Sequence, residues 1–251
     1  MKILVIGDSC TDKYVYTKSE RLCPEAPVPV LQKVRETENL GMAGNVYRNL
    51  EALGAEVDLI SNIGPDPRHG PGIEKIRFVD NATNQMFIRY DVNDYTQNIG
   101  KKKLHGINFG IYDAVVISDY NKGFLETHDI DYIARTHPIT FMDTKKILGS
   151  WAAAVTYIKL NQYEWQKSLA EGDVAGLIEK TVLTLGNHGC SFQGMNYPVQ
   201  NVEIKDVSGA GDTFLAGLVV NYIKTKDINC ALHFANECAT KVVQMKGVTT
   251  V

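Results

Sequence analysis

The stretch Asp206-Val207-Ser208-Gly209-Ala210-Gly211-Asp212-Thr213-Phe214 is the most informative part of this chain of 251 residues. It follows a strand-like segment, Val202–Ile204, and opens an apolar helix. Gly209 and Gly211 allow a tight turn and let a ligand approach the peptide N–H groups closely. A helix N-terminus carries unpaired N–H groups and partial positive charge, which suits a phosphate. The pattern therefore predicts a phosphate cradle built from the backbone of Gly209, Ala210 and Gly211.

Asp212 lies in the first turn of the helix that this stretch opens. A carboxylate at that point can take a proton from a hydroxyl that attacks a cradled phosphoryl group. The alternative is a Gly-rich turn in which Asp212 only complements the helix dipole. The other motifs along the chain favour phosphoryl transfer.

Short apolar runs typical of buried strands recur along the chain, and several are flanked by helical patterns. One helical pattern runs from Ala43 to Leu53 and stops at Gly54, and Asp227 caps a longer one that ends near Gly247. This alternation predicts an α/β fold, with a mostly parallel central sheet, helices on both faces and ligands at the carboxyl edge. The predicted strands are Ile3–Ile6, Val57–Ile60, Ala114–Ile117, Thr140–Met142, Thr156–Leu160 and Val182–Leu185.

Two regions, about residues 14–34 and 73–91, are rich in β-branched and aromatic residues and interrupt that alternation. Three prolines restrict the first region to extended or edge geometry. In the second region, apolar Met86, Ile88 and Tyr90 alternate with their neighbours as a strand requires. These regions predict additional β structure outside the central sheet.

Composition excludes several classes of protein. The net charge is −3 and the basic residues are scattered, which argues against nucleic acid or a membrane surface as a partner. Five widely spaced cysteines without a Cys-x-x-Cys pair indicate reduced thiols, and His188 and His233 lack partners at metal-ligand spacing. The first seven residues form a buried strand pattern, not a signal peptide, and no apolar run approaches membrane-spanning length. We expect a cytoplasmic protein.

The signature at 206–212 resembles that of the ribokinase-like carbohydrate kinases. Further segments occur in family order along nearly the whole chain and resemble one branch, the heptose 7-phosphate kinase module of bacterial ADP-heptose synthesis. They are Gly7-Asp8, Asp12-Lys13-Tyr14, Pro24–Val30, Ser118–Gly123, Phe234-Ala235-Asn236 and Gly247–Val251.

The resemblance implies a kinase that uses ATP and Mg²⁺ to phosphorylate the anomeric hydroxyl of a heptose 7-phosphate-like sugar, which gives a 1,7-bisphosphate. It implies one ribokinase-like domain over residues 1–251, with a small β lid formed by about 14–34 and 73–91, and no nucleotidyltransferase domain. The expected partners are a sugar phosphate and ATP. Because lid strands have open edges, we also expect a homodimer through the lid.

The resemblance further implies Asp212 as the general base and the Gly209, Ala210 and Gly211 amides as the anion hole. Asp8 and Asp12 follow the first strand at its ligand edge, where carboxylates can bind sugar hydroxyls or be held by nearby N–H groups. Asn45 is a sugar contact by resemblance and an N-cap by position. The expected sugar-binding set is Asp8, Asp12, Gly41, Asn45, Arg89 and Lys122.

Arg89 and Lys122 enter that set because a sugar phosphate needs a second anion site. Four basic residues are candidates for this site: Arg21, Arg89, Lys122 and Lys145. Arg89 is favoured because it lies on a predicted lid strand. Lys122 follows the strand that ends at Ile117.

The nucleotide side of the site is expected from two turns and one helix. Asn161 and Glu164 resemble the family's Asn-x-x-Glu element, in which the Glu holds Mg²⁺ through water, and the same spacing suits a helix-capping pair. The turn from Thr184 to Gly189 resembles one that borders the nucleotide, or is a turn without a ligand. The expected nucleotide-binding residues are Asn161, Thr184, Gly186, Gly189 and Asn236, and nearby Lys159 meets phosphate or solvent.

Three departures from the family pattern bear on the substrate. Met42 replaces the second glycine of the Gly-Gly-x-x-Asn sugar signature, and we expect its side chain near the sugar. Residues 64–72 and 164–184 are shorter than usual. Two rivals therefore stay open: a kinase for another sugar, sugar phosphate or nucleoside, and a non-catalytic protein that binds sugar or nucleotide.

Overall fold

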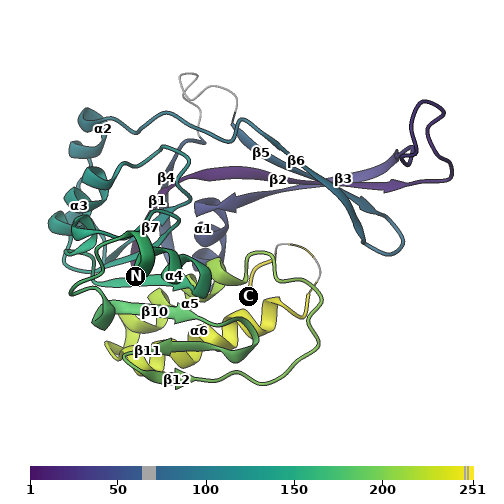
Figure 1. Ribbon diagram of the computed structural model, residues 1–251. Helices are drawn as coiled ribbons and strands as arrows, with labels where there is room; N and C mark the ends of the chain where they lie inside the picture. Colours follow the sequence, from purple (N-terminus) through teal and green to yellow (C-terminus); the bar gives the residue numbers. More distant parts are fainter. Residues whose placement is uncertain (64–71, 246, 248) are drawn as a thin grey trace.

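The computed structural model describes residues 1–63, 72–245, 247 and 249–251. Within these ranges the strands form two sheets, and the chain folds as a layered body from which the second sheet projects (Figure 1). Of the segment 64–72 that the sequence marks as shortened, all but Gly72 lies outside the described residues.

The central sheet has eight strands in the order β12-β11-β10-β9-β8-β7-β1-β4. Pairing is parallel from β4 through β1, β7, β8 and β9 to β10, and β11 and β12 add an antiparallel edge. All six predicted strands are present, so the predicted mostly parallel α/β fold is confirmed. Their bounds are β1 Lys2–Gly7, β4 Glu56–Ser61, β7 Ala114–Asp119, β8 Thr140–Thr144, β9 Tyr157–Asn161, β10 Thr181–Thr184, β11 Cys190–Phe192 and β12 Met195–Tyr197.

Helices cover both faces of this sheet because successive strand side chains point to opposite sides. Ile3 and Val5 of β1 pack into a core with α1, α5 and α6, whereas Leu4 and Ile6 pack into a second core on the other face, beneath α2, α3 and α4. The helices are α1 Ala43–Ala52, α2 Lys101–His105, α3 Thr127–Thr136, α4 Gln162–Glu171, α5 Ala210–Thr225 and α6 Ile228–Val242. The side chain of Asp227 caps α6 by accepting from the amides of Asn229 and Cys230, as its sequence position predicts.

The second sheet has the order β3-β2-β5-β6, with β2 Ser9–Lys18, β3 Gln32–Met42, β5 Ile73–Asp80 and β6 Met86–Val92. It contains parts of the two regions expected to form a lid, and it also includes residues 9–13 and 35–42. Residues 19–31, which hold the proline-rich segment, lie at its far end (Figure 1). We call this sheet the lid sheet.

The two sheets join without a linker at one place. Asp8 alone separates β1 from β2, and β3 runs directly into α1. The amide of Ala43, the first residue of α1, donates to the carbonyl oxygen of Asp8 at 2.9 Å. The ends of the lid strands are therefore fixed to each other and to the central sheet.

Met42, at the junction of β3 and α1, does not line the cavity described below. Its side chain is buried in a cluster with Cys10 and Ile73, against which Tyr120 packs. The expectation that Met42 narrows the sugar pocket is therefore not supported. Its backbone lies at φ 58° and ψ −128°, a conformation that glycine adopts far more readily than a residue with a side chain.

We predict that the strain at Met42 is measurable from two substitutions. Met42→Ala and Met42→Gly both lose the buried side chain, at a cost of about 2–5 kcal/mol of unfolding free energy. Only glycine also relieves the backbone, a gain of about 1–3 kcal/mol. Urea unfolding should therefore find Met42→Gly more stable than Met42→Ala. Equal stability, or a more stable alanine variant, would show that the backbone is relaxed.

Candidate active site

A cavity of about 450 Å³ opens at the carboxyl ends of the central strands, against the first turn of α5 and one side of α6. The residues expected to bind nucleotide and those expected to transfer phosphate line this one cavity, although they come from distant parts of the chain. They are Asn161, Thr184, Gly186, Gly189, Asn236, Gly209, Ala210, Gly211 and Asp212.

The turn before α5 has the geometry expected for a helix start that faces a ligand. Gly209 is the N-cap residue and has φ 79°, a left-handed conformation that favours glycine. The amide of Ala210 donates to the carbonyl oxygen of Val207 at 3.2 Å, so one of the three predicted anion donors is already engaged. Asp206 ties the loop to the chain end by accepting from the amides of Ser208 and Gly247.

The segment before this turn is not a strand. Residues 202–204 lie outside both sheets, and Val202 and Ile204 line the cavity. The prediction of a strand at Val202–Ile204 was wrong because its apolar side chains pack along the cavity, and none of its backbone pairs with the sheet edge at β12.

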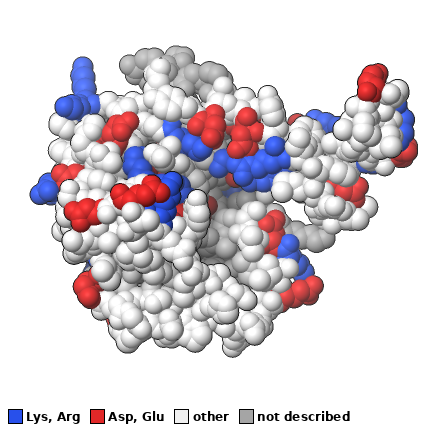
Figure 2. All heavy atoms as spheres, viewed as in Figure 1, with Lys and Arg blue, Asp and Glu red and all other residues white. Residues whose placement is uncertain are grey.

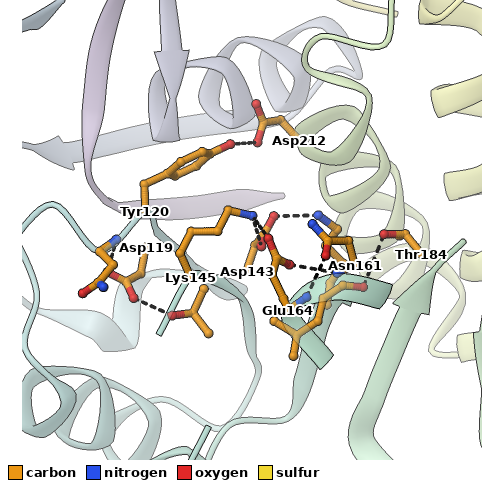
Figure 3. Close-up of polar contacts among 12 residues, drawn as sticks. Asp119, Tyr120, Asp143, Lys145, Asn161, Glu164, Thr184 and Asp212 are labelled. Atoms are coloured by element: carbon orange, nitrogen blue, oxygen red, sulfur yellow. Dashed lines mark hydrogen bonds and ion pairs between the residues drawn. The ribbon is translucent and has the colours of Figure 1, made fainter. Parts of the chain in front are cut away.

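Asp212 lies at the inner end of the cavity, where its side chain is buried. One carboxylate oxygen accepts from the Asn45 side-chain amide at 2.9 Å. The other accepts from the Tyr120 hydroxyl at 2.7 Å (Figure 3). Burial raises the pKa of Asp212, and the two hydrogen bonds act against that rise because they stabilise the ionised form. The site thus holds a desolvated carboxylate with fixed orientation.

Beside Asp212, two lysines and two carboxylates form a cluster at the ends of β8 and β9 (Figure 3). Asp143 pairs with Lys159 at 2.7 Å and with Lys145 at 3.5 Å, and Lys145 also pairs with Glu164. Burial by itself raises the pKa of Asp143, but the two ammonium groups outweigh it and the pKa lies below its usual value. For Lys145, the two carboxylates outweigh burial and raise the pKa. Lys145 therefore stays cationic, and the Lys145 and Lys159 side chains both line the cavity, where an anion can meet them.

Asp143 was not predicted from the sequence, and Lys145 was expected only as a candidate for the distal phosphate. Asp143 lies near the carboxyl end of the buried strand β8, and Lys145 comes directly after that strand. In the parallel pairing of β8 with β9, Asp143 stands opposite Lys159. A polar Asp-x-Lys pattern after an apolar strand was the available signal.

Asn161 and Glu164 form a reciprocal capping box at the start of α4, the alternative that the sequence left open. The Asn161 side chain accepts from the Glu164 amide at 2.9 Å, and the Glu164 side chain accepts from the Asn161 amide at 2.8 Å. The pair therefore positions α4 at the rim of the cavity.

The carboxylates of Asp143 and Glu164 are the groups that fit a magnesium ion best. Within the described chain, each of their oxygens has one partner, an ammonium or amide nitrogen. A carboxylate oxygen can accept a second hydrogen bond, so water molecules on Mg²⁺ can bind there without displacing a lysine. Among the described residues no group of three or more His, Cys, Asp or Glu side chains is placed to hold an ion directly. The donors present fit an ion held through water.

On the nucleotide side, Asn236 and Thr184 already have protein partners. The Asn236 side chain is buried and donates to the Tyr197 carbonyl oxygen at 2.8 Å, and the Thr184 hydroxyl donates to the Leu160 carbonyl oxygen at 3.3 Å. These bonds fix the cavity wall and leave acceptor atoms for a ligand.

Of the expected sugar-binding residues, Asp8 is fully buried and its carboxylate accepts three backbone amides, from Tyr120, Lys122 and Phe124. This is the alternative in which N–H groups hold the acid. Asp8 thereby fixes the loop after β7, while the Asn45 side-chain amide donates to Asp212.

Asp12 lies on the lid sheet and pairs with Arg77 at 2.5 Å. Gly41 lies against it, because a Cβ atom there would come within 2.1 Å of an Asp12 oxygen. A glycine at position 41 therefore makes room for the Asp12 carboxylate, whatever else it contacts.

One face of the lid sheet gathers charge, because residues directly opposite each other on neighbouring strands share a face. The pairs Asp12 with Lys75, Lys75 with Asp91, and Arg77 with Arg89 stand opposite each other. Figure 2 shows Lys and Arg side chains beside Asp and Glu side chains where the lid sheet leaves the body. Lys75 and Arg77 were missed because the parallel pairing of β2 with β5 cannot be read from the sequence.

Arg89 and Lys122, the favoured candidates for the distal phosphate, already have carboxylate partners. Arg89 makes two bonds to Asp91, at 2.7 and 2.6 Å, and Lys122 bonds Asp94 at 2.5 Å. Burial lowers the pKa of nearby Lys75, which pairs with no carboxylate among the described residues. An anion entering this region would compete with Asp91 and Asp94 for the cations.

Comparisons with known proteins agree with this geometry. Residues 127–251 match the pfkB family carbohydrate kinases. The bifunctional protein HldE of Helicobacter acinonychis (strain Sheeba) is 33% identical over 293 residues, which cover 98% of this chain and 63% of that protein. The chain thus spans less than two thirds of this relative.

Solved structures share the fold at low sequence identity. The nucleoside kinase of Methanocaldococcus jannaschii, an archaeal member of the ribokinase family, has a TM-score of 0.71 at 17% identity, covering 98% of this chain and 93% of its own. The ribokinase of Arabidopsis thaliana, complexed with ribose and ATP, has a TM-score of 0.69 at 15% identity, covering 98% and 93%.

The fold and the site define a carbohydrate kinase with a ribokinase-like architecture. The chain belongs to the pfkB family of carbohydrate kinases. In the part of the chain that the structure describes, no helix has the length and apolar character needed to cross a membrane.

Proposed function

We propose that this protein is an ATP- and Mg²⁺-dependent kinase that phosphorylates the anomeric hydroxyl of a heptose 7-phosphate-like sugar. The observation that carries the proposal is the position of Asp212, a buried carboxylate in the first turn of α5 that lines the same cavity as the expected nucleotide-binding residues. The Asp212 carboxylate also accepts hydrogen bonds from Asn45 and Tyr120. Asn45 lies in α1, which directly follows lid strand β3, and the Tyr120 ring packs against the cluster of Cys10, Met42 and Ile73 on the lid strands.

The reaction follows from this arrangement. The sugar hydroxyl oxygen forms a bond to the γ-phosphorus of ATP, the bond from that phosphorus to the bridging oxygen breaks, and ADP leaves. Asp212 takes the hydroxyl proton. Lys145 and Lys159, with amides at the start of α5, stabilise negative charge on the phosphoryl oxygens. Mg²⁺, when bound through Glu164, neutralises phosphate charge.

Two observations support a phosphorylated sugar as the acceptor. The lid sheet presents Lys75, Arg77 and Arg89 on one face, and a phosphate group can bind guanidinium and ammonium groups there. The likeness to the heptose 7-phosphate kinase branch, seen in the motifs along the sequence and in the match to the HldE protein, supports a heptose.

Two rival functions have distinct outcomes in one assay. ADP release with heptose 7-phosphate, fructose 6-phosphate, ribose and a nucleoside would identify a kinase for a different acceptor. The nucleoside kinase and ribokinase folds among the similar structures make this panel informative. No ADP release with any acceptor, combined with tight binding, would identify a non-catalytic binding protein.

We also propose a homodimer in the cytoplasm. The outer strand β6 exposes Met86, Ile88 and Tyr90, each more than half exposed, and an open strand edge with apolar side chains favours pairing with a second copy. Five free cysteines fit a reducing compartment.

We predict that light scattering finds a dimer, with a mass of twice the 27.8 kDa of the chain. Replacing Ile88 by Lys should return the mass to that of a monomer, and a wild-type monomer at all concentrations would exclude this dimer.

The central prediction concerns the base. Asp212→Asn keeps the shape of the side chain but cannot take the proton, and the loss of a general base lowers kcat by about 10²–10⁴-fold. This corresponds to about 3–5 kcal/mol of transition-state stabilisation. ATP affinity measured by calorimetry should be preserved or slightly tighter, because a negative charge near the phosphates is removed.

Asp227→Asn is the matched control, since it makes the same change at another helix start and asparagine also caps well. Its kcat should equal that of the wild type. A near-wild-type rate for Asp212→Asn would reject Asp212 as the base.

The prediction for the acceptor concerns Arg89. If this side chain binds the distal phosphate, Arg89→Ala raises KM for the sugar phosphate far more than KM for the unphosphorylated sugar. Arg135→Ala is the control, because Arg135 pairs with Asp131 in the same way on the surface of α3. Equal effects on both acceptors would remove Arg89 from the phosphate site.

A further inference from the structure

Tyr120 joins the loop after β7 to the carboxylate of Asp212, 92 residues away along the chain. Its hydroxyl donates to one Asp212 oxygen at 2.7 Å (Figure 3). Asn45 donates to the other oxygen at 2.9 Å. Sequence reasoning assigned no role to Tyr120, although it lies in a segment that resembles the family.

The position of Tyr120 is fixed at both ends. Its backbone amide donates to Asp8 at 2.7 Å, and its ring packs against the buried cluster that contains Met42. The ammonium groups of Lys75, from the lid sheet, and Lys145, from the nucleotide cavity, lie 5.3 and 5.2 Å from the ring centre. A side chain held in this way has little freedom to turn, so its hydroxyl stays directed at Asp212.

We propose that Tyr120 is a positioning residue for the general base: its hydroxyl holds the Asp212 carboxylate in the direction of the acceptor and stabilises its ionised form. The inference rests on the proposed role of Asp212 as the base. A carboxylate that accepts hydrogen bonds at both oxygens keeps one orientation, and each oxygen still has a lone pair for the proton of the sugar hydroxyl.

The charge around Asp212 shows which way the effect runs. Burial and the nearby Asp143 carboxylate favour the protonated acid, and hydrogen bonds from Asn45 and Tyr120, with the charge of Lys159, favour the carboxylate. The groups that face Asp212 come from five parts of the fold: Asn45 of α1, Tyr120 after β7, Asp143 and Lys145 at the end of β8, Lys159 of β9 and Cys10 of β2. Removing the Tyr120 hydroxyl therefore raises the pKa of Asp212.

The test is Tyr120→Phe, which keeps the ring between the two lysines and removes only the hydroxyl. We expect kcat to fall about tenfold or more, the effect of losing a hydrogen bond to a charged group. The acid limb of the kcat/KM profile should move to higher pH by about one unit, because the base must be ionised to act. The affinity for ATP should not change.

Tyr112→Phe is the matched control. The Tyr112 hydroxyl also donates to an aspartate, Asp58, at 2.9 Å, and it lies outside the cavity. This variant should keep the wild-type rate and acid limb. A second variant keeps the hydroxyl: replacing Tyr120 by 3-fluorotyrosine makes the phenol a stronger donor, and the acid limb should then move to lower pH.

A readout without turnover separates this inference from the proposed function. In ¹³C NMR of aspartate-labelled protein, the Asp212 carboxyl signal, identified by its loss in Asp212→Asn, should titrate at higher pH in Tyr120→Phe than in the wild type. That shift would support the positioning role even if no tested sugar is phosphorylated. An unchanged Asp212 titration, or a Tyr120→Phe enzyme as fast as the wild type or faster, would overturn it.

Discussion

A buried carboxylate is costly to the folded state unless hydrogen-bond donors surround it, and this requirement organises the centre of the molecule. Asp212 receives its donors from α1, which also packs against α5 in the core, and from the loop after β7. Each donor is in turn secured. Asn49 donates to the Asn45 carbonyl oxygen and accepts from Thr213, and Asp8 holds the β7 loop through three amides. Polar groups buried at this depth are costly unless fully paired, so the network fixes one arrangement of three elements.

The lysines of the cavity, like the Asp212 carboxylate, are buried or half-buried charges that need partners, and here the partners are carboxylates. Lys145 and Lys159 are paired with Asp143 and Glu164. Removing one partner of a buried pair leaves an uncompensated charge, so these carboxylates hold the lysines in place before any phosphate arrives. A nucleotide then meets ammonium groups that are already oriented, and the cost of ordering two long side chains falls on folding and not on binding.

How much of this could be read from the sequence depends on the range of the interactions. Apolar strand runs, the cap at Asp227 and the Gly209–Gly211 turn are local features, and each was predicted correctly. The errors concern contacts between distant segments. Residues 202–204 do not form the expected strand, because their backbone does not pair with either sheet. Lys75 and Arg77 were missed because the register of β2 against β5 is a long-range property. Met42 was expected near the sugar, and its side chain is buried with Cys10 and Ile73, a packing that the sequence did not reveal. The roles of the site residues remain predictions.

The two sheets are joined without a linker, so the long lid sheet extends directly from one short segment of the central sheet. β2 has ten residues, which at about 3.3 Å each reach roughly 33 Å from Asp8. At its base, the Ala43 amide of α1 donates to the carbonyl oxygen of Asp8, and the Asp8 side chain accepts from the loop after β7. Helix α1, which begins at this joint, carries the Asn45 amide that contacts the Asp212 carboxylate. The lid sheet and the Asn45 contact to Asp212 therefore share one attachment point, so a partner that bound residues 19–31 and changed the angle of the lid sheet would act on the joint that holds Asn45 against the proposed base.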